Sequence, residues 1–401
     1  MGALAAVMTG PGAGAIATIQ LFGTSARATL PKVFQPTGPA PLALATGRVF
    51  LGHIVDGDDV IDQVTLGCEA PDTYAIHCHG NPLLVERIME VLQQHGVSLI
   101  AAEELLGKML ASRQPCDAIA VEAKLALATV KTVEAAKMLA YQIEAGLSAM
   151  AGSWRQLADS GQFERVINEA GEVLRRSEPV RLLLSGCTIA LIGPANSGKS
   201  TLLNALAGRE KALVTDIKGT TRDWVSAEIH LPPLAATVID TAGLDADLAA
   251  APESDVDRMA QAASKQILDR ADVILLVLDG SRPACRLDSQ LVEALNDKKV
   301  VTVLNKSDLP QRFDPAGLAD HLHPPVRISA KRETGIEDLI QAIHEACNVT
   351  RFDPHTPVAF TPRQTVLLEK LVHASSTKRA AAYTAQLMDP RPFDVVIRTA
   401  K

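Results

Sequence analysis

The first hundred residues carry short apolar runs that fit β-strands. Four such runs occupy residues 15–22, 47–55, 62–68 and 74–78, and Gly, Pro and Asp residues separate them. Short apolar stretches bounded by turn residues predict strands. A single helical stretch, LLVERIMEVLQQ at residues 83–94, follows the fourth run. The pattern predicts a small α+β domain over residues 1–100.

The pattern turns helical after residue 100. Ala, Leu, Glu and Lys recur at helical spacing through residues 122–154, which predicts the first part of a helical domain over residues 101–185. After a Pro-containing linker at residues 351–362, a second helical pattern fills residues 363–387. We expect this second part, within residues 349–401, to dock on the earlier helices.

Between residues 186 and 348, apolar runs alternate with loops and helical stretches. The runs are TIALIG, ATVID, DVILLVLDG, KVVTVLN and VRISA. Such alternation is typical of a parallel doubly wound sheet, which binds its ligands at the carboxyl ends of the strands. We therefore look for chemistry directly after each run.

Composition narrows the class of protein. The chain of 401 residues has 47% hydrophobic and 21% charged residues and a net charge of −7, which argues against a nucleic-acid partner held by bulk electrostatics. Six cysteines stand without paired spacing, as is usual for reduced thiols in a cytosolic protein. No apolar run reaches bilayer length, and the N-terminus lacks a signal-peptide pattern. We expect a cytoplasmic protein.

Residues 193–200 read GPANSGKS, between the run TIALI and a helical stretch. This strand–loop–helix context identifies a P-loop, whose backbone amides cradle phosphates. Lys199 would reach the β- and γ-phosphates as a catalytic residue, and Ser200 would bind Mg²⁺. The phosphate-binding residues are Asn196, Ser197, Gly198, Lys199, Ser200 and Thr201.

Two further motifs follow in the order expected of a nucleotide hydrolase. VTDIKGTTRD at residues 214–223 is placed as a switch loop, with Thr221 as the second hydroxyl ligand of Mg²⁺. Asp240 ends the run ATVID and would hold Mg²⁺ through water, while Thr241 and Ala242 lead to Gly243, whose amide would face the γ-phosphate as a catalytic group. Leu244 then stands where many small GTPases have a water-orienting glutamine, so another residue must hold the water.

The last two motifs select the base. In NKSD, which comprises Asn305, Lys306, Ser307 and Asp308, the aspartate can accept both N1–H and the exocyclic N–H of guanine. Adenine does not offer this donor pair, so the motif favours GTP over ATP. In SAK, which comprises Ser329, Ala330 and Lys331, a backbone amide would bind the guanine O6.

These motifs, with HGN at residues 79–81 after a strand, resemble the tRNA-modification GTPase MnmE (TrmE) family. The resemblance implies an α/β P-loop GTPase domain inserted in a helical domain, with an N-terminal α+β folate-binding-like domain. It also implies a homodimer that works with an FAD-dependent MnmG-type partner on the wobble uridine of tRNA. The alternative from the residues is a GTP-dependent regulatory or assembly switch, for instance with ribosomes.

The resemblance implies how the missing glutamine is replaced. In the family a K⁺ ion bridges the phosphates between two G domains, and its ligands match Asn196, Thr215, Ile217 and Thr220. The matching loop at the nucleotide comprises Thr215, Asp216, Ile217, Lys218, Gly219, Thr220 and Thr221. The family's catalytic glutamate falls at Asp257, within Val256-Asp257-Arg258. Lys218 occupies a small-residue position, and its ammonium either faces solvent or reaches the phosphates.

Two departures from the family bear on the modification chemistry. The family's folate-contacting arginine and glutamate fall at Gln20 and Ala75, so both charges are replaced and folate binding is expected to be weak. The family also ends in a motif of cysteine, glycine and lysine, whereas this sequence ends FDVVIRTAK. We expect the GTPase motifs to be retained more closely than the folate chemistry.

Two other groups of residues favour structural interpretations. His77 and His79 share a strand face, but two ligands rarely complete a metal site. Arg175, Arg176 and Arg181 form a basic cluster that could touch tRNA, although a solvated helix end is the simpler reading.

Overall fold

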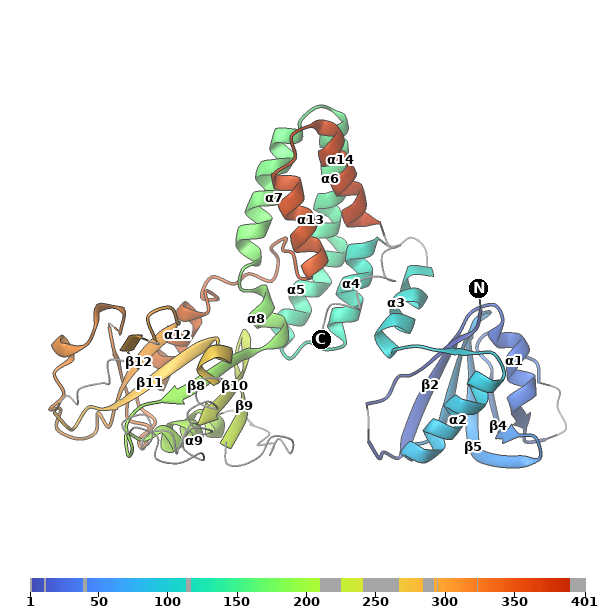
Figure 1. Cartoon of the computed structure of the whole chain (residues 1–401), viewed down its shortest axis with the longest axis horizontal. Helices are drawn as coiled ribbons and strands as arrows, with labels where there is room; N and C mark the ends of the chain where they lie inside the picture. Colours follow the sequence, from blue (N-terminus) through green and yellow to red (C-terminus); the bar gives the residue numbers. More distant parts are fainter. Residues whose placement is uncertain are drawn as a thin grey trace. The chain divides into compact units, whose positions relative to one another are not determined.

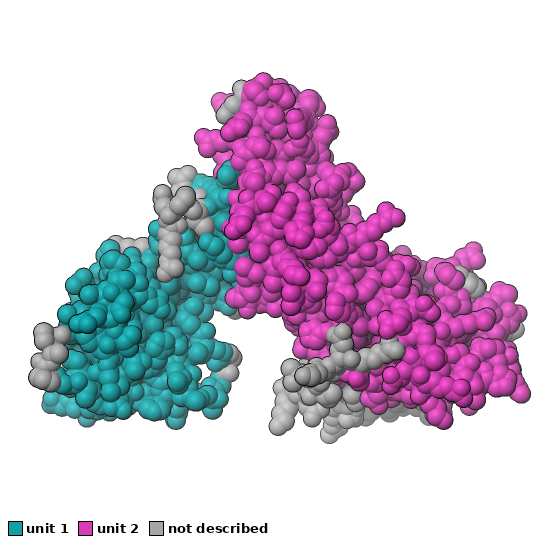
Figure 2. Space-filling view, turned by 180° about the vertical axis from the view of Figure 1, so that it is seen from behind, with its two compact units in different colours: residues 1–125, 388–401 teal, residues 126–387 magenta. Residues whose placement is uncertain are grey.

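The computed structural model describes residues 2–10, 12–38, 42–112, 117–209, 225–240, 267–283, 292–293, 295–322 and 324–389. The chain forms two compact units, residues 1–125 with 388–401 and residues 126–387 (Figure 2). Among the described residues, no helix combines the length and the apolarity needed to cross a membrane.

The first unit contains a seven-stranded sheet in the order β3-β4-β5-β6-β2-β1-β7 (Figure 1). The strands are β1 (Leu4–Val7), β2 (Ile16–Phe22), β3 (Phe34–Pro36), β4 (Val49–Asp56), β5 (Asp59–Ala70), β6 (Thr73–His79) and β7 (Ser98–Leu99). The pairings are antiparallel except for the parallel pair β1 and β7. The predicted strands are confirmed, and the short strands β1, β3 and β7 were not predicted.

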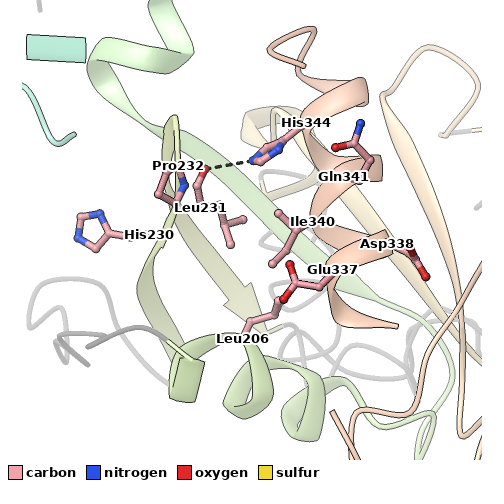
Figure 3. A pocket seen from close by; sticks show the side chains of 9 residues that line it. All are labelled: Leu206, His230, Leu231, Pro232, Glu337, Asp338, Ile340, Gln341 and His344. Atoms are coloured by element: carbon pink, nitrogen blue, oxygen red, sulfur yellow. Dashed lines mark hydrogen bonds between the residues drawn. The ribbon is translucent and has the colours of Figure 1, made fainter. Parts of the chain in front are cut away.

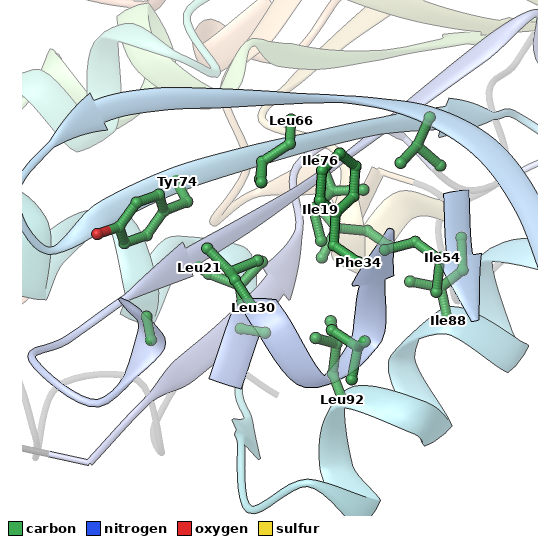
Figure 4. Packing of buried hydrophobic residues seen from close by; sticks show 14 of the residues in the cluster. Ile19, Leu21, Leu30, Phe34, Ile54, Leu66, Tyr74, Ile76, Ile88 and Leu92 are labelled. Atoms are coloured by element: carbon green, nitrogen blue, oxygen red, sulfur yellow. The ribbon is translucent and has the colours of Figure 1, made fainter. Parts of the chain in front are cut away.

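Helices cover both faces of this sheet. The core face packs on α1 (Ala26–Val33) and α2 (Pro82–Gln94), and Ile19, Ile76 and Leu92 are among its fully buried side chains (Figure 4). On the opposite face, Leu105 and Met109 of α3 (Ala102–Ser112) pack against Ala6 and Phe22.

The expectation of a single helix in this region is wrong. Helix α1 was missed because it is only eight residues long and contains Pro31, and an internal proline normally argues against a helix. Its buried residues Leu30 and Val33 supply the reason that it forms, since they join the core of the sheet.

The second unit begins with helices where the sequence predicts them. They are α5 (Val133–Glu144), α6 (Leu147–Asp159), α7 (Phe163–Ser177) and α8 (Val180–Ser185), while α4 (Ala118–Leu127) spans the boundary between the units. The Thr132 hydroxyl caps α5 by accepting from the Ala135 amide, which satisfies one of the free donors of a helix start.

The C-terminal helices return to these earlier helices (Figure 1). Helix α13 (Pro362–Val372) packs against α7, and α14 (Thr377–Met388) follows it. In the preceding segment, the Gln142 side chain donates to Thr356 O at 3.0 Å and accepts from Val358 N at 3.1 Å. The Ala359 amide donates to the Ser177 hydroxyl at 2.7 Å. The expected docking is therefore confirmed.

In the sequence, the segment between the two groups of helices forms a six-stranded sheet in the order β13-β12-β11-β8-β10-β9. Its strands are β8 (Cys187–Ile192), β9 (Val225–Leu231), β10 (Leu234–Asp240), β11 (Val273–Asp279), β12 (Val300–Asn305) and β13 (Val326–Arg327). Helices α9 (Lys199–Arg209) and α12 (Ile336–Ala346) belong to the same part of the unit. The central strand β11 is an almost fully buried apolar run, as parallel strands covered on both faces must be.

One strand departs from the predicted parallel sheet. Strand β9 pairs antiparallel with β10, in register from Leu231 opposite Leu234 to Val225 opposite Asp240. The two strands form a hairpin through Pro232 and Pro233, and the peptide bond between them is cis. An antiparallel edge strand is compatible with an otherwise parallel sheet. The expectation of parallel pairing therefore holds for the other strands of this sheet.

Candidate nucleotide-binding site

The P-loop connects the end of β8 to the start of α9. Gly198 has φ +98°, and a Cβ there would lie 2.2 Å from the Asn305 side-chain nitrogen, so only glycine fits this position. Lys199 is 5% exposed, and its ammonium donates to Gly193 O at 2.8 Å and to Pro194 O at 3.3 Å. These bonds curl the loop around the ammonium and set up a positively charged phosphate cradle.

Two of the three predicted Mg²⁺ ligands, Ser200 and Asp240, are among the described residues, and their side chains contact each other. Ser200 Oγ donates to Asp240 Oδ2 at 2.6 Å. Ser200 lies at the start of α9, directly after the P-loop that follows β8. Because β8 and β10 are parallel neighbours, with Leu191 opposite Asp240, Ser200 and Asp240 meet at the same edge of the sheet. A hydroxyl and a carboxylate side by side form a hard oxygen donor set, which fits Mg²⁺.

Asn305 joins three segments that are distant in sequence. It is 2% exposed, and its Nδ2 donates to Ser197 O of the P-loop at 2.9 Å. Its Oδ1 accepts from Lys306 N at 2.8 Å and from Ala330 N of the SAK motif at 3.0 Å. The first residue of NKSD therefore organises the site, because one side chain positions both the phosphate loop and the base loop.

The Lys306 side chain contacts both the P-loop and Asp279, a residue that the sequence analysis did not identify. Its ammonium donates to Asn196 O and to Asp279 Oδ2, each at 2.7 Å. Burial alone would raise the pKa of Asp279, but hydrogen bonds from Lys306 and Ser281 outweigh it and lower that pKa. Asp279 ends β11, and its place at the carboxyl end of a strand is the signal that could have identified it.

Asp308, the residue predicted to select the base, is held in place by the SAK motif. Ser329 Oγ donates to Asp308 Oδ1 at 2.6 Å, and this hydrogen bond lowers the Asp308 pKa. The Ser329 hydroxyl also accepts from Arg332 N at 3.2 Å. Asp308 is therefore an oriented, ionised acceptor, which is the form that the guanine donors require.

The remaining predicted residues divide into two groups. Thr201 lies exposed in the first turn of α9, and Lys331 is exposed directly after Ala330. The following predicted residues lie outside the described part of the chain: Thr215, Asp216, Ile217, Lys218, Gly219, Thr220, Thr221, Thr241, Ala242, Gly243, Leu244 and Asp257.

In the first unit, Gln20 and Ala75, where the resemblance implies that charged folate contacts have been replaced, lie opposite each other. Gln20 of β2 pairs with Ala75 of β6. The Gln20 amide donates to Glu69 Oε2 and to Tyr74 O, both at 3.1 Å. Gln20 is 6% and Ala75 2% exposed. The Gln20 side chain is therefore engaged within the sheet.

The two histidines of HCH have separate hydrogen-bond partners. His77 Nδ1 lies 3.0 Å from Thr18 Oγ1, and His79 Nδ1 lies 2.7 Å from Asp62 Oδ1. Cys78 between them is buried in the core. These contacts give each side chain a structural role.

The predicted basic cluster is largely ion-paired. Arg175 and Arg176 both bind Glu172, and Arg181 binds Asp272. Asp272 also accepts from Thr188 N at 2.9 Å. The Arg181 contact thus links α8 to the sheet of the same unit.

A cavity of about 740 Å³ lies apart from the motif residues, between the β9–β10 hairpin and α12 (Figure 3). Its lining includes His230, Leu231 and Glu337, and His344 Nε2 donates to Leu231 O at 3.1 Å. Among the described residues, none of those predicted to bind the nucleotide lines it.

A mostly parallel sheet that gathers a P-loop, a hydroxyl beside a carboxylate, and the NKSD and SAK motifs is typical of a P-loop GTPase. Two family models match accordingly. Residues 3–104 match the model described as GTP-binding protein TrmE N-terminus, and residues 188–306 match the model described as 50S ribosome-binding GTPase.

Relatives that match over most of the chain identify the family. The tRNA modification GTPase MnmE of Enterococcus faecalis is 31% identical over 376 residues, which cover 84% of this chain and 79% of that protein. The tRNA modification GTPase MnmE of Bacillus subtilis is 31% identical over 381 residues, covering 86% and 82%. Among solved structures, the G domain of the T. maritima FeoB iron transporter is 27% identical, covers 40% of this chain and 98% of that chain, and has a TM-score of 0.31. The chain belongs to the tRNA modification GTPase MnmE family and is a GTPase.

Proposed function

We propose that this protein is a dimeric, K⁺-activated GTPase of the cytoplasm that supports modification of the wobble uridine of tRNA with an FAD-dependent MnmG-type partner. The observation that carries the GTPase part is the Asn305 side chain, which holds Ser197 O and Ala330 N at 2.9 and 3.0 Å. One side chain thereby holds the phosphate loop and the base loop together, which supports a single nucleotide-binding site. Family membership supports the tRNA part.

The metal ions in this proposal have distinct roles. Ser200, Asp240 and Thr221 would hold Mg²⁺, which supplies charge neutralisation for the phosphates. Asn196 would be a K⁺ ligand, together with Thr215, Ile217 and Thr220. The exposed position of Asn196, with its carbonyl held by Lys306 at 2.7 Å, supports a ligand at the surface of the P-loop. A ligand at the surface is what an ion shared between two G domains would require.

The proposal includes the family's domain arrangement. In it, residues 186–348 are a G domain inserted in a helical domain that comprises residues 101–185 and 349–401. Packing of α13 on α7 supports this arrangement. Residues 1–100 are the folate-binding-like domain with a dimerisation role.

The test is the wobble nucleoside content of tRNA. We expect a deletion strain of the source organism to lose the aminomethyl-type modification, as measured by mass spectrometry of tRNA hydrolysates. The parent gene should restore the modification. A Lys199→Ala gene should not, because it lacks the phosphate-binding ammonium. Unchanged nucleosides in the deletion strain would reject the tRNA role and favour the regulatory switch.

The proposal predicts weak folate binding. Gln20 and Ala75 are uncharged, so they cannot replace a charged pair that holds the two ends of a folate. We expect the parent and Gln20→Ala to bind 5-formyl-tetrahydrofolate equally weakly in equilibrium dialysis. Tight binding by the parent would show that other residues supply the folate contacts. Circular dichroism of both proteins would control for folding.

A further inference from the structure

Two buried cysteines meet at the base of the nucleotide-binding sheet. Cys187 is the first residue of β8, and Cys347 is the C-cap residue of α12. Each is 1% exposed, and their sulfur atoms are 3.7 Å apart although 160 positions separate them in sequence. Both are free thiols. A disulfide requires the sulfurs to approach to about 2.05 Å, so its formation requires the two side chains to move closer together.

The two cysteines lie at the two ends of the segment that carries the nucleotide-binding motifs. Every nucleotide-binding motif lies between Cys187 and Cys347. Gly186, with φ +87°, directly precedes the first cysteine, and Asn348, with φ +58°, directly follows the second. Both residues turn the chain in the left-handed region. The pair therefore sits where the chain enters and leaves this part of the unit.

The surroundings make the two thiols unequal. Their mutual hydrogen bond lowers the pKa of Cys347, while the same bond and burial raise the pKa of Cys187. Lys299 and Arg181 favour the Cys347 thiolate further, whereas burial and Asp272 oppose it. Because the thiolate is the reactive form of cysteine, the lowered pKa of Cys347 favours its sulfur as the first to react, and the distance of 3.7 Å leaves Cys187 within reach to resolve the product.

We propose that Cys187 and Cys347 are a reversible oxidation site at which a small hydroperoxide forms a disulfide that joins the two chain connections of the nucleotide-binding segment. Burial restricts the oxidant to a molecule the size of hydrogen peroxide. This inference concerns a site outside the GTPase machinery, and it does not depend on the tRNA role.

The reaction balances in two steps. The Cys347 thiolate attacks one peroxide oxygen and the O–O bond breaks, so that Cys347 becomes a sulfenic acid and the other oxygen leaves as water after taking a proton. The Cys187 sulfur then attacks the sulfenic sulfur, and a second water leaves. The two thiols lose two electrons and the peroxide gains them. A dithiol reductant reverses the change by thiol–disulfide exchange.

The experiment treats the folded full-length protein with hydrogen peroxide, blocks the remaining thiols under denaturing conditions and maps the peptides by mass spectrometry. We expect a peptide that links Cys187 to Cys347, formed about tenfold or more faster than oxidation of Cys68 and Cys78 and removed by dithiothreitol. Cys68 and Cys78 are matched controls because each is 3% exposed and burial raises the pKa of each.

A variant identifies the order of reaction. In Cys187→Ser, we expect Cys347 to accumulate as a sulfenic acid that dimedone traps. In Cys347→Ser, we expect Cys187 to stay reduced over the same time. If Cys187 and Cys347 of the parent remain alkylatable after Cys68 and Cys78 have been oxidised, the proposal is overturned. It is equally overturned if either cysteine links to another residue instead.

The effect of the disulfide on thermal stability can be measured separately. A disulfide that closes so long a loop restricts the unfolded chain, so we expect peroxide to raise the thermal midpoint of the parent by about 5 °C or more. Cys187→Ser should show no rise. An unchanged midpoint in fully linked parent protein would show that the bond does not restrain the segment.

Discussion

Replacing Asp308 with asparagine is expected to lower the affinity for GTP by about 10⁴-fold, the scale of discrimination when a buried polar match is lost. The carboxylate offers two acceptors to guanine N1–H and the exocyclic N–H, whereas the asparagine amide turns one acceptor into a donor. The donor would instead match the O2 atom of xanthine. Binding of xanthosine triphosphate should therefore improve in the same variant, as measured by calorimetric titration of both nucleotides.

Two further variants serve as comparisons for Asp308→Asn. Ser329→Ala removes the hydroxyl that donates to Asp308 Oδ1 at 2.6 Å. It should weaken GTP binding by only about tenfold, because a hydrogen bond to a charged group is lost but the carboxylate stays. Asp269→Asn is the matched control, since its side chain is 61% exposed and pairs with Lys298. GTP affinity retained in Asp308→Asn would refute the assignment of the base site.

Turnover of GTP is expected to rise when K⁺ replaces Na⁺, and to rise with protein concentration, because two G domains must meet around the ion. A cation that compensates charge as an arginine finger does can accelerate hydrolysis by about 10³- to 10⁵-fold. Asn196→Ala should lose most of the K⁺ response. Asp257→Asn should reduce turnover by about 10²-fold or more, because the water loses its base. Steady-state phosphate release at matched ionic strength measures all four effects.

Lys218 provides two distinguishable outcomes. If its ammonium faces solvent, Lys218→Ala remains K⁺-dependent. If it reaches the phosphates, the parent ignores K⁺ and Lys218→Ala acquires the dependence. Normal turnover in Asp257→Asn, with folding and dimerisation intact, would remove Asp257 from the mechanism and assign the water to a residue within 244–255.

Local sequence determined the chemistry of the nucleotide site. A P-loop is a strand, a glycine turn and a helix start in one continuous stretch, so residues 193–200 carry the information needed for a phosphate cradle. The same holds for Asp240, Asn305 and Ser329, because each follows its own apolar strand and parallel strands end at a common edge. The class of nucleotide could therefore be predicted before any contact was known.

Elements with weak or contradictory local signals could not be predicted in this way. Helix α1 contains Pro31, and its formation depends on burying Leu30 and Val33 against a sheet whose strands come mostly later in the chain. Strand β9 is not among the apolar runs that predicted strands, and its hairpin with β10 decides its antiparallel direction. Tertiary packing outweighs local preference in both cases.

The sequence by itself thus determined which residue types stand in the nucleotide-binding motifs, and the tertiary structure decided which side chains touch one another. Asn305 meets Ser197 and Ala330, and Lys306 meets Asp279, through hydrogen bonds that span 25 to 108 positions. Cys187 and Cys347 meet because α12 ends beside the start of β8. Periodicity records only neighbours within a few residues, so contacts over such distances arise only when strand order and helix packing bring the segments together.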